Sequence, residues 1–196
     1  MPRNALRLHP AYTHILLLLV LSVLFFLPAV VRPDVLIYPA YSPFSDLTVI
    51  HWPYFDLLAH TYHNYGEIAL WKGFSLGGTP LVANPLAMTA YPLTYLFIGL
   101  PINQVLVSLP IFHVVASGIG VYLYVRLALG HRRSAAFLAA VLFMFSGKLM
   151  SHVAGGHVSL VAAMAWLPWI FLGVNRAVVR RSVAASVLTG LAVALQ

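Results

Sequence analysis

The stretch NQVLVSLPIFHVVASGIGVYLYV, from Asn103 to Val125, holds 23 residues and contains no Asp, Glu, Lys or Arg. An α-helix needs about 20 mostly apolar residues to cross the hydrocarbon core of a bilayer. The whole chain of 196 residues is 61% hydrophobic and only 8% charged, whereas soluble domains carry roughly 25% charged residues. A soluble fold has no way to cover this much apolar surface. The sequence therefore predicts an all-α integral membrane protein built as a polytopic helical bundle.

Five apolar segments follow one another along the chain. The first is long for a signal peptide and lacks a small-residue cleavage site, so we interpret it as an uncleaved helix. The last is still apolar at Gln196, which predicts an N-terminal fragment of a longer protein; a complete small protein with a short final helix is the alternative. We expect one transmembrane domain with spans at about residues 14–31, 103–125, 134–150, 158–174 and 182–196, a large loop over 32–102 and a short loop over 151–157.

Basic residues are distributed unevenly between the two sides that these spans define. Eight arginines fall on one side: Arg3, Arg7, Arg126, Arg132, Arg133, Arg176, Arg180 and Arg181. The other side has three basic residues: Arg32, Lys72 and Lys148. Loops rich in Lys and Arg stay in the cytoplasm, so we expect a cytoplasmic N-terminus in the cell inner (plasma) membrane. The four acidic residues then lie in an extracytoplasmic first loop: Asp34, Asp46, Asp56 and Glu67.

The large loop has its own helical pattern. From Tyr54 to Leu70 apolar residues recur at helical spacing, while polar residues occupy the opposite face. This pattern predicts an amphipathic helix at the membrane surface. The apolar stretch Leu86–Leu100 is interrupted by Pro92 and Gly99, so we expect a second interfacial or re-entrant segment and not a full span.

Several classes of function lack their sequence signatures. The chain has no cysteine, which excludes disulfides, thiol nucleophiles and zinc–thiolate sites. It has no nucleotide-binding glycine motif and no Ser-His-Asp pattern. The net charge of +7 is explained by the cytoplasmic arginines, so we expect no nucleic-acid partner.

Asp46 is the first candidate for chemistry. It follows the first span by about 15 residues, in the sequence Ser-Pro-Phe-Ser-Asp-Leu. A carboxylate near the membrane surface can act as a general base on a hydroxyl group. The alternative is a helix N-cap, because Ser45 and Asp46 precede a helix-compatible run.

Two groups of histidines offer weaker candidates. The set Asp56, His60, His63 and Glu67 has the spacing of metal ligands on one helical face; the alternative is the solvated face of a surface helix. His152 and His157 flank two glycines beside Lys148 and together could hold an anionic headgroup or a phosphate. A glycine turn with interfacial histidines is the alternative there. His113, inside the second span, is expected to make a hydrogen bond within the bundle.

One ordered series of motifs is more specific than composition. It comprises Leu70-Trp71-Lys72-Gly73, Gly78-Thr79-Pro80-Leu81, Ala83-Asn84-Pro85, Tyr91-Pro92-Leu93, His113, Tyr122, Arg126, Phe145-Ser146-Gly147, His152, Gly156-His157 and Trp166-Leu167-Pro168-Trp169. The series resembles the bacterial YfhO-like multi-span membrane proteins, which look like GT-C-type glycosyltransferases. Many relatives carry a second acid beside the one that matches Asp46, whereas this chain has Ser45 there.

The resemblance implies a membrane glycosyltransferase of inverting type. Such enzymes transfer a sugar from a polyprenyl-phosphate-linked donor to an extracytoplasmic glycan, lipid or protein acceptor. By the resemblance Asp46 becomes the catalytic base that activates the acceptor, or else a residue that binds the acceptor. The substrate-binding candidates are Lys72, Lys148, His152, His157, Asn84 and Trp71. Nothing in the sequence requires a divalent cation or another cofactor. A transporter or flippase of lipid-linked glycans, or a non-catalytic membrane subunit, are the alternatives.

Overall fold

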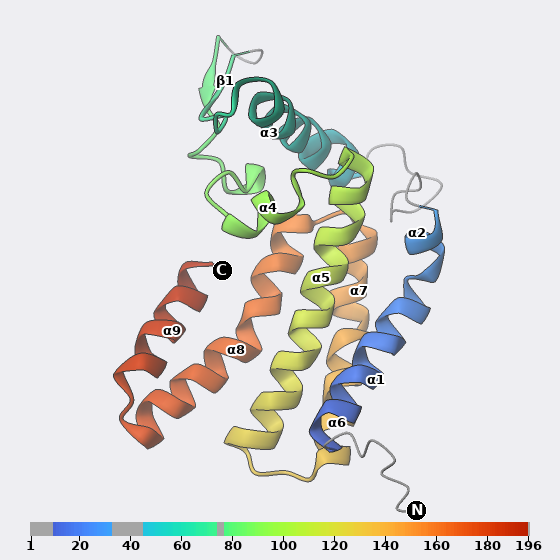
Figure 1. Ribbon diagram of the computed structural model, residues 1–196, viewed down its shortest axis with the longest axis vertical. Coiled ribbons are helices and arrows are strands. Elements are labelled where there is room, and N and C mark those ends of the chain that lie inside the picture. The colour runs from blue at the N-terminus through green and yellow to red at the C-terminus, as the bar shows by residue number, and fades with distance from the viewer. Residues whose placement is uncertain (1–9, 33–44, 74–76, 196) are drawn as a thin grey trace, which may run out of the picture. The chain divides into compact units, whose positions relative to one another are not determined.

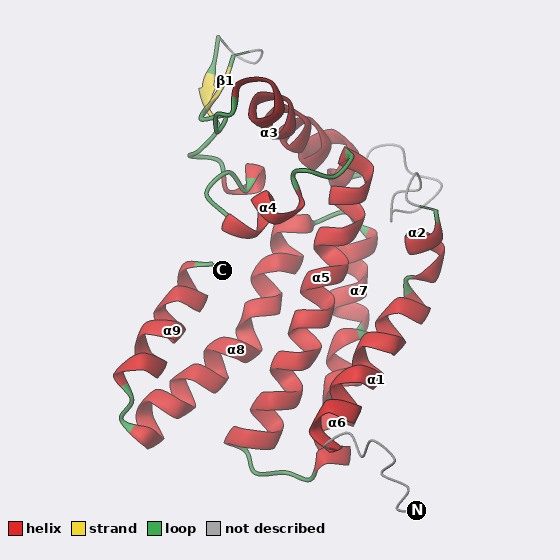
Figure 2. Ribbon diagram, viewed as in Figure 1, coloured by secondary structure: helices red, strands yellow, loops and turns green. Residues whose placement is uncertain are grey.

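The computed structural model describes residues 10–32, 45–73 and 77–195. Helices make up 77% of it, which confirms the all-α expectation (Figures 1 and 2). Within these residues three helical stretches are long and apolar enough to cross a membrane: Ile102–Ala128, Arg133–Ala154 and Val158–Arg180. Arg3, Arg7 and Asp34, which entered the charge count above, lie outside the described residues.

The chain divides into two compact units. One contains residues 1–27, 114–146 and 164–196, and the other contains residues 28–113 and 147–163. The described helices of the first unit are α1 (Pro10–Phe25), the C-terminal part of α5 (Ile102–Leu123), the π-helix η3 (Tyr124–Ala128), α6 (Arg133–Met144), the C-terminal part of α8 (Val158–Arg180) and α9 (Val183–Ala194).

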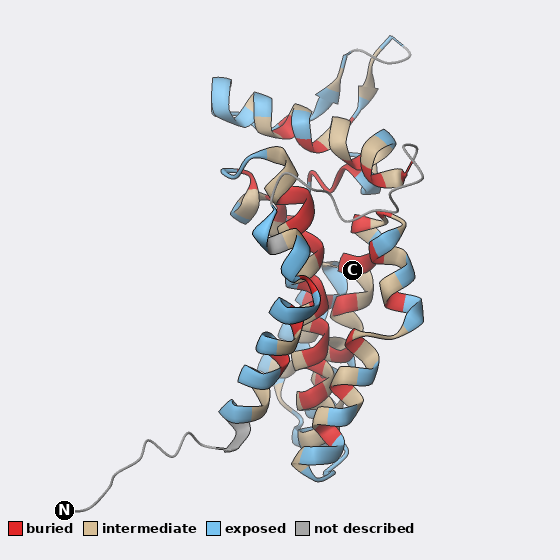
Figure 3. Ribbon diagram, turned by 90° about the vertical axis from the view of Figure 1, so that its right-hand side faces the viewer, coloured by how far each residue is buried: buried red, intermediate tan, exposed pale blue. Residues whose placement is uncertain are grey.

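The helices of the first unit expose apolar side chains. On α1 and the turn after it, the buried residues Leu18, Ser22 and Phe26 form one stripe at four-residue spacing, whereas Leu17 and Leu24 are exposed. In Figure 3 the helix next to the N-terminal trace is accordingly mostly pale blue. A helix that is apolar on every side is suited to a hydrocarbon environment.

Glycines let the helices of this unit approach closely. A Cβ at Gly118 of α5 would collide with the thioether of Met144 on α6. A Cβ at Gly120 would lie 2.7 Å from the indole Nε1 of Trp169 on α8, and that indole N–H donates to the carbonyl of Ala116 at 2.9 Å. Small residues at helix crossings permit the van der Waals packing that drives helix association in lipid.

Gly118→Ala should therefore destabilise the protein by about 1–3 kcal/mol, because the added methyl overpacks the α5–α6 contact. Thermal unfolding in detergent, followed by circular dichroism, measures the effect. Gly190→Ala on α9 is the matched control, since a Cβ there meets no atom within 4 Å. Equal melting temperatures for the two variants would show that the close contact at Gly118 contributes nothing.

The second unit contains most of the polar residues of the chain. Its first described elements are α2 (Leu27–Val31), of which all but Leu27 belongs to this unit, the π-helix η1 (Leu47–His51) and α3 (Trp52–Tyr65). The strands β1 (Trp71–Lys72) and β2 (Thr79–Pro80), the 3-10 helix η2 (Pro85–Ala87) and α4 (Pro92–Phe97) follow. The unit also contains the N-terminal part of α5, α7 (Gly147–Ala154) and the first turns of α8. The two strands pair antiparallel, with Trp71 opposite Pro80. A small apolar core joins α3, the segments flanking the two strands, η2 and the end of α4: Leu58, Ala69, Leu81, Ala87 and Ile98.

The amphipathic helix predicted over Tyr54–Leu70 is present but shifted. α3 begins at Trp52 and ends at Gly66, which adopts a left-handed φ of 68° and donates its N–H to the carbonyl of Tyr62. A glycine in this conformation is a common helix stop. Leu86–Leu100 contains no span-length helix, because the chain makes only η2 and then α4, which Pro92 begins.

The apolar segments also differ in length from the predicted spans. The predicted first and third spans each contain a short break in the helix, at Phe26 and at Phe145–Ser146 respectively. Despite its break, the third span is contained in the membrane-length stretch Arg133–Ala154. The second and fourth continue to Ala128 and Arg180, past the predicted ends at 125 and 174. Each of these helices continues past an arginine, Arg126 or Arg176, which is compatible with a helix end because a long Arg side chain can keep its charged head in water. The fifth segment contains α9, which ends at Ala194.

Candidate functional site

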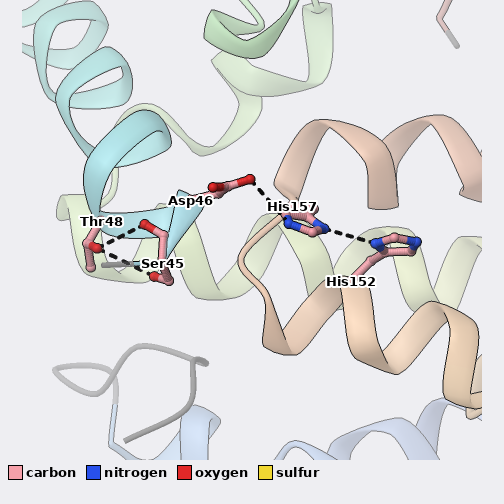
Figure 4. A network of polar contacts seen from close by, with 5 residues as sticks. All are labelled: Ser45, Asp46, Thr48, His152 and His157. Atoms are coloured by element: carbon pink, nitrogen blue, oxygen red, sulfur yellow. Dashed lines mark hydrogen bonds and ion pairs between the residues drawn. The ribbon is translucent and has the colours of Figure 1, made fainter. Parts of the chain in front are cut away.

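Asp46 of the second unit directs its carboxylate toward His157 and away from its own helix. In the first turn of η1 the carbonyl of Ser45 accepts from the N–H groups of Thr48 and Val49 and from the hydroxyl of Thr48, each at 3.0 Å. The Asp46 side chain makes no capping hydrogen bond. Asp46 therefore occupies the N-cap position of η1, but its carboxylate does not cap the helix. Asp46 Oδ2 instead lies 3.2 Å from His157 Nε2 (Figure 4).

A tight turn between α7 and α8 places His157. Gly156 has a φ of 76°, and a Cβ on it would lie 2.5 Å from the Cβ of Leu47. Only glycine permits this conformation and this approach. The turn is closed by the N–H of His157, which donates to the carbonyl of His152 at 3.0 Å. The loop predicted over 151–157 is thus shorter, because α7 extends to Ala154.

The two histidines of this turn bond to each other. His157 Nδ1 and His152 Nδ1 lie 2.9 Å apart (Figure 4). A hydrogen bond between two imidazole nitrogens needs one proton, so one Nδ1 donates and the other accepts. Asp46, His157 and His152 therefore form a continuous chain from a carboxylate through two imidazoles. Its outer end is open, since the Asp46 side chain is 49% exposed.

The inner end of this hydrogen-bonded series, at His152, is buried. His152 Nε2 has no hydrogen-bond partner within the part of the protein that the structure describes. It belongs to a small cavity with room for about one water molecule, lined otherwise mainly by apolar side chains, Leu106 and Val161 among them.

The hydrogen-bonded series from Asp46 to His152 has two possible proton arrangements. If His157 is neutral and donates to Asp46, His152 Nε2 is a bare lone pair; one additional proton makes His157 an imidazolium between Asp46 and His152.

Nitrogen-15 NMR of histidine-labelled protein should detect this N–H···N bond as a correlation between two Nδ1 atoms. We expect His152→Phe to abolish it. His152→Asn should preserve the protonation pattern of His157, because its amide can replace Nδ1–H as donor. Two protonated Nδ1 atoms without a mutual correlation in the unmodified protein would contradict the arrangement.

His51 is a fourth member of the site that the sequence did not single out. It is 1% exposed, and its Nδ1 has no partner among the described residues. Burial lowers the pKa of His51 to about 4, against the raising effects of the Asp46 charge and of a hydrogen bond to the backbone of Leu86; a charge on His157 would lower it further. His51 is consequently neutral at pH 7 and adds no charge beside the Asp46–His157 pair.

This buried histidine should make stability depend on pH. The unfolded chain binds a proton at His51 below a pKa of 6.5, whereas the folded chain binds it only near 4. The contribution of His51 to the free energy of unfolding is therefore fully present above about pH 6.5. It falls by up to about 3 kcal/mol as the pH drops toward 4. Melting temperature against pH measures this, and His51→Leu should flatten the slope. His60→Gln, at an exposed position on α3, is the control; equal acid sensitivity in His51→Leu would contradict the assignment.

Lys148 lies on α7 one turn before His152. Its side chain is exposed, while its carbonyl accepts from the hydroxyl of Ser151 at 2.9 Å. Residues four apart share one face of a helix. The structure thus groups the predicted residues Asp46, Lys148, His152 and His157, but the two histidines bond to the carboxylate and to each other.

Two of the remaining predicted substrate-binding residues, Lys72 and Asn84, contact Tyr54 of α3. Lys72 Nζ lies 5.1 Å from the centre of the Tyr54 ring, a cation–π arrangement. Asn84 donates from Nδ2 to the Tyr54 hydroxyl at 2.9 Å and caps η2 by accepting from the N–H of Leu86. Trp71 lies against Gly78 and is 58% exposed. These contacts tie the β1–β2 hairpin and η2 to α3.

The histidines on α3 show no metal site. His60 contacts Asn64, and His63 Nδ1 bonds to the carbonyl of Ala59. Asp56 is exposed, and Glu67 lies beyond the end of the helix. Over residues 10–32, 45–73 and 77–195, no three His, Asp or Glu side chains come close enough to bind a metal ion.

His113 makes the internal hydrogen bonds expected of it. Its Nδ1 bonds to the carbonyl of Leu109 at 2.7 Å, and its Nε2 lies 2.5 Å from the hydroxyl of Tyr91. Because Nδ1 must be the donor to a carbonyl, a neutral ring accepts from the tyrosine at Nε2. The pair is buried and ties the segment before α4 to α5.

Comparison of the chain with protein-family models, with curated proteins and with solved structures found no match.

Proposed function

We propose that this protein is a polytopic membrane transferase that uses Asp46 as a general base on an acceptor hydroxyl. The hydrogen-bonded chain of Asp46, His157 and His152 is the observation that carries the proposal. A carboxylate held by an oriented imidazole is a recurrent arrangement in proton transfer, because each partner fixes the orientation and tautomer of the next.

Membrane insertion is supported by the three long apolar helices and by the exposed leucines of α1. The arginine distribution supports a cytoplasmic N-terminus in the inner membrane. Asp46 would then face the extracytoplasmic side, where the acceptor is available.

The resemblance to YfhO-like proteins adds the donor, a sugar linked to polyprenyl phosphate. In the proposed step the acceptor oxygen forms a bond to the anomeric carbon while the bond from that carbon to the phosphate oxygen breaks. The acceptor proton passes to the free carboxylate oxygen of Asp46, and polyprenyl phosphate leaves with the electron pair. A single displacement of this kind inverts the anomeric centre.

The neighbouring residues have distinct parts in this scheme. His157 is a positioning residue, since it holds one carboxylate oxygen and leaves the other open to the acceptor. His152 positions His157 in turn. Lys148 is exposed one turn away and offers a point charge for the departing phosphate. Lys72 and Trp71 offer a cation and an exposed aromatic face for the sugar or its carrier.

Replacing Asp46 by Asn should lower sugar transfer by about 10²–10⁴-fold, because the amide cannot accept the proton. Transfer is measured in membrane vesicles with a polyprenyl-phosphate-linked hexose, and donor binding is measured in parallel. We expect donor binding to change little. Asp56→Asn, an exposed carboxylate on α3, is the matched control and should retain activity.

Near-normal transfer by Asp46→Asn would remove the catalytic assignment. Translocation of the lipid-linked sugar without bond cleavage would support the alternative of a flippase, and this outcome is read from the same vesicles.

A further inference from the structure

A second cavity lies in the first unit, among the C-terminal part of α8, α9 and the end of α5. Its volume is about 620 Å³, within the range of about 300–1,000 Å³ typical of ligand sites. Figure 1 shows α9 returning alongside α8, and the two helices approach closely at Gly173, where a Cβ would collide with the hydroxyl of Thr189. None of the candidate catalytic residues lines this cavity.

The lining of this cavity is amphipathic. Most of it is apolar, with Leu123, Leu172 and Leu188 beside the indoles of Trp166 and Trp169. Several polar groups of the lining already make hydrogen bonds within the protein. The Trp169 N–H donates to Ala116, the Thr189 hydroxyl donates to Ala185, and the Ser182 hydroxyl caps α9 by accepting from the N–H of Ala185.

Two arginines supply the charge at one end. Arg176 and Arg180 both line the cavity and are exposed, and their four-residue spacing places them on one face of α8. Ser182, at the N-terminus of α9, lies at the same end, where the helix dipole also favours an anion. Every acidic residue of the chain lies between Asp34 and Glu67, so no carboxylate of the lining competes for the guanidinium groups.

We propose that this cavity binds an anionic phospholipid. The phosphate would pair with Arg176 and Arg180, whose planar donors match its oxygens, and an acyl chain would lie between the tryptophans and leucines. A free phosphate would leave the apolar part unfilled, and a neutral lipid would leave the arginines without a counter-charge. Basic pockets between helices commonly recognise lipid headgroups in this way.

Quenching of tryptophan fluorescence by brominated lipids tests the proposal directly. The chain has four tryptophans, and the Trp52→Phe/Trp71→Phe background leaves Trp166 and Trp169 as reporters inside the cavity. The protein is reconstituted into phosphatidylcholine vesicles that contain dibrominated phosphatidylglycerol or dibrominated phosphatidylcholine. We expect the anionic lipid to bind about 30-fold more tightly, roughly fivefold for each arginine.

Three variants separate charge from packing. Arg176→Gln/Arg180→Gln should abolish the preference, Arg176→Lys/Arg180→Lys should preserve most of it, and Arg132→Gln/Arg133→Gln, outside the cavity, should leave it unchanged. Equal quenching by both lipids in the unmodified protein would overturn the proposal, as would a preference that survives the glutamine variant. Absence of quenching by either lipid would show that protein covers the cavity and would also overturn it. None of these readouts depends on sugar transfer.

Discussion

The close approach of Gly156 to Leu47 is the constraint on which the candidate site depends. It brings the start of η1 onto the turn before α8, two segments that are far apart in the sequence. A side chain at position 156 would displace η1, and the 3.2 Å contact between Asp46 and His157 would be lost. The chain from Asp46 to His152 is thus a consequence of one close backbone approach.

Burial divides the polar groups around this contact into two kinds. Asp46 and His157 are partly exposed and able to meet a substrate, whereas His51 and His152 Nε2 are enclosed. An enclosed imidazole resists protonation because its charged form loses hydration. His51 therefore remains neutral beside the Asp46–His157 pair.

Asp46, His152 and His157 could be found from the sequence because polar groups are rare in such an apolar chain. Their partners could not, since helical spacing describes one segment at a time and does not report which segments meet. The two histidines were candidates for holding a phosphate or an anionic headgroup, with an interfacial glycine turn as the alternative; their contacts with Asp46 and with each other had no signal in the sequence. No motif or spacing in the sequence marks His51 as part of the site; only its being a histidine does. The ends of the helices were the least predictable feature. They depend on single residues such as Gly66 and on the Arg-rich turns, and the apolar periodicity of a segment does not report them.

The meeting of these two segments is tested most directly by cross-linking, which is clean because the chain has no cysteine. Asp46→Cys/His157→Cys should be cross-linked rapidly by a short bis-methanethiosulfonate reagent, which reacts with both thiols, in native membranes. In Asp56→Cys/His157→Cys one thiol is moved about 15 Å along the same helical run, and the reaction should be much slower. Equal rates for the two pairs would contradict the contact between Asp46 and His157, and with it the proposed site.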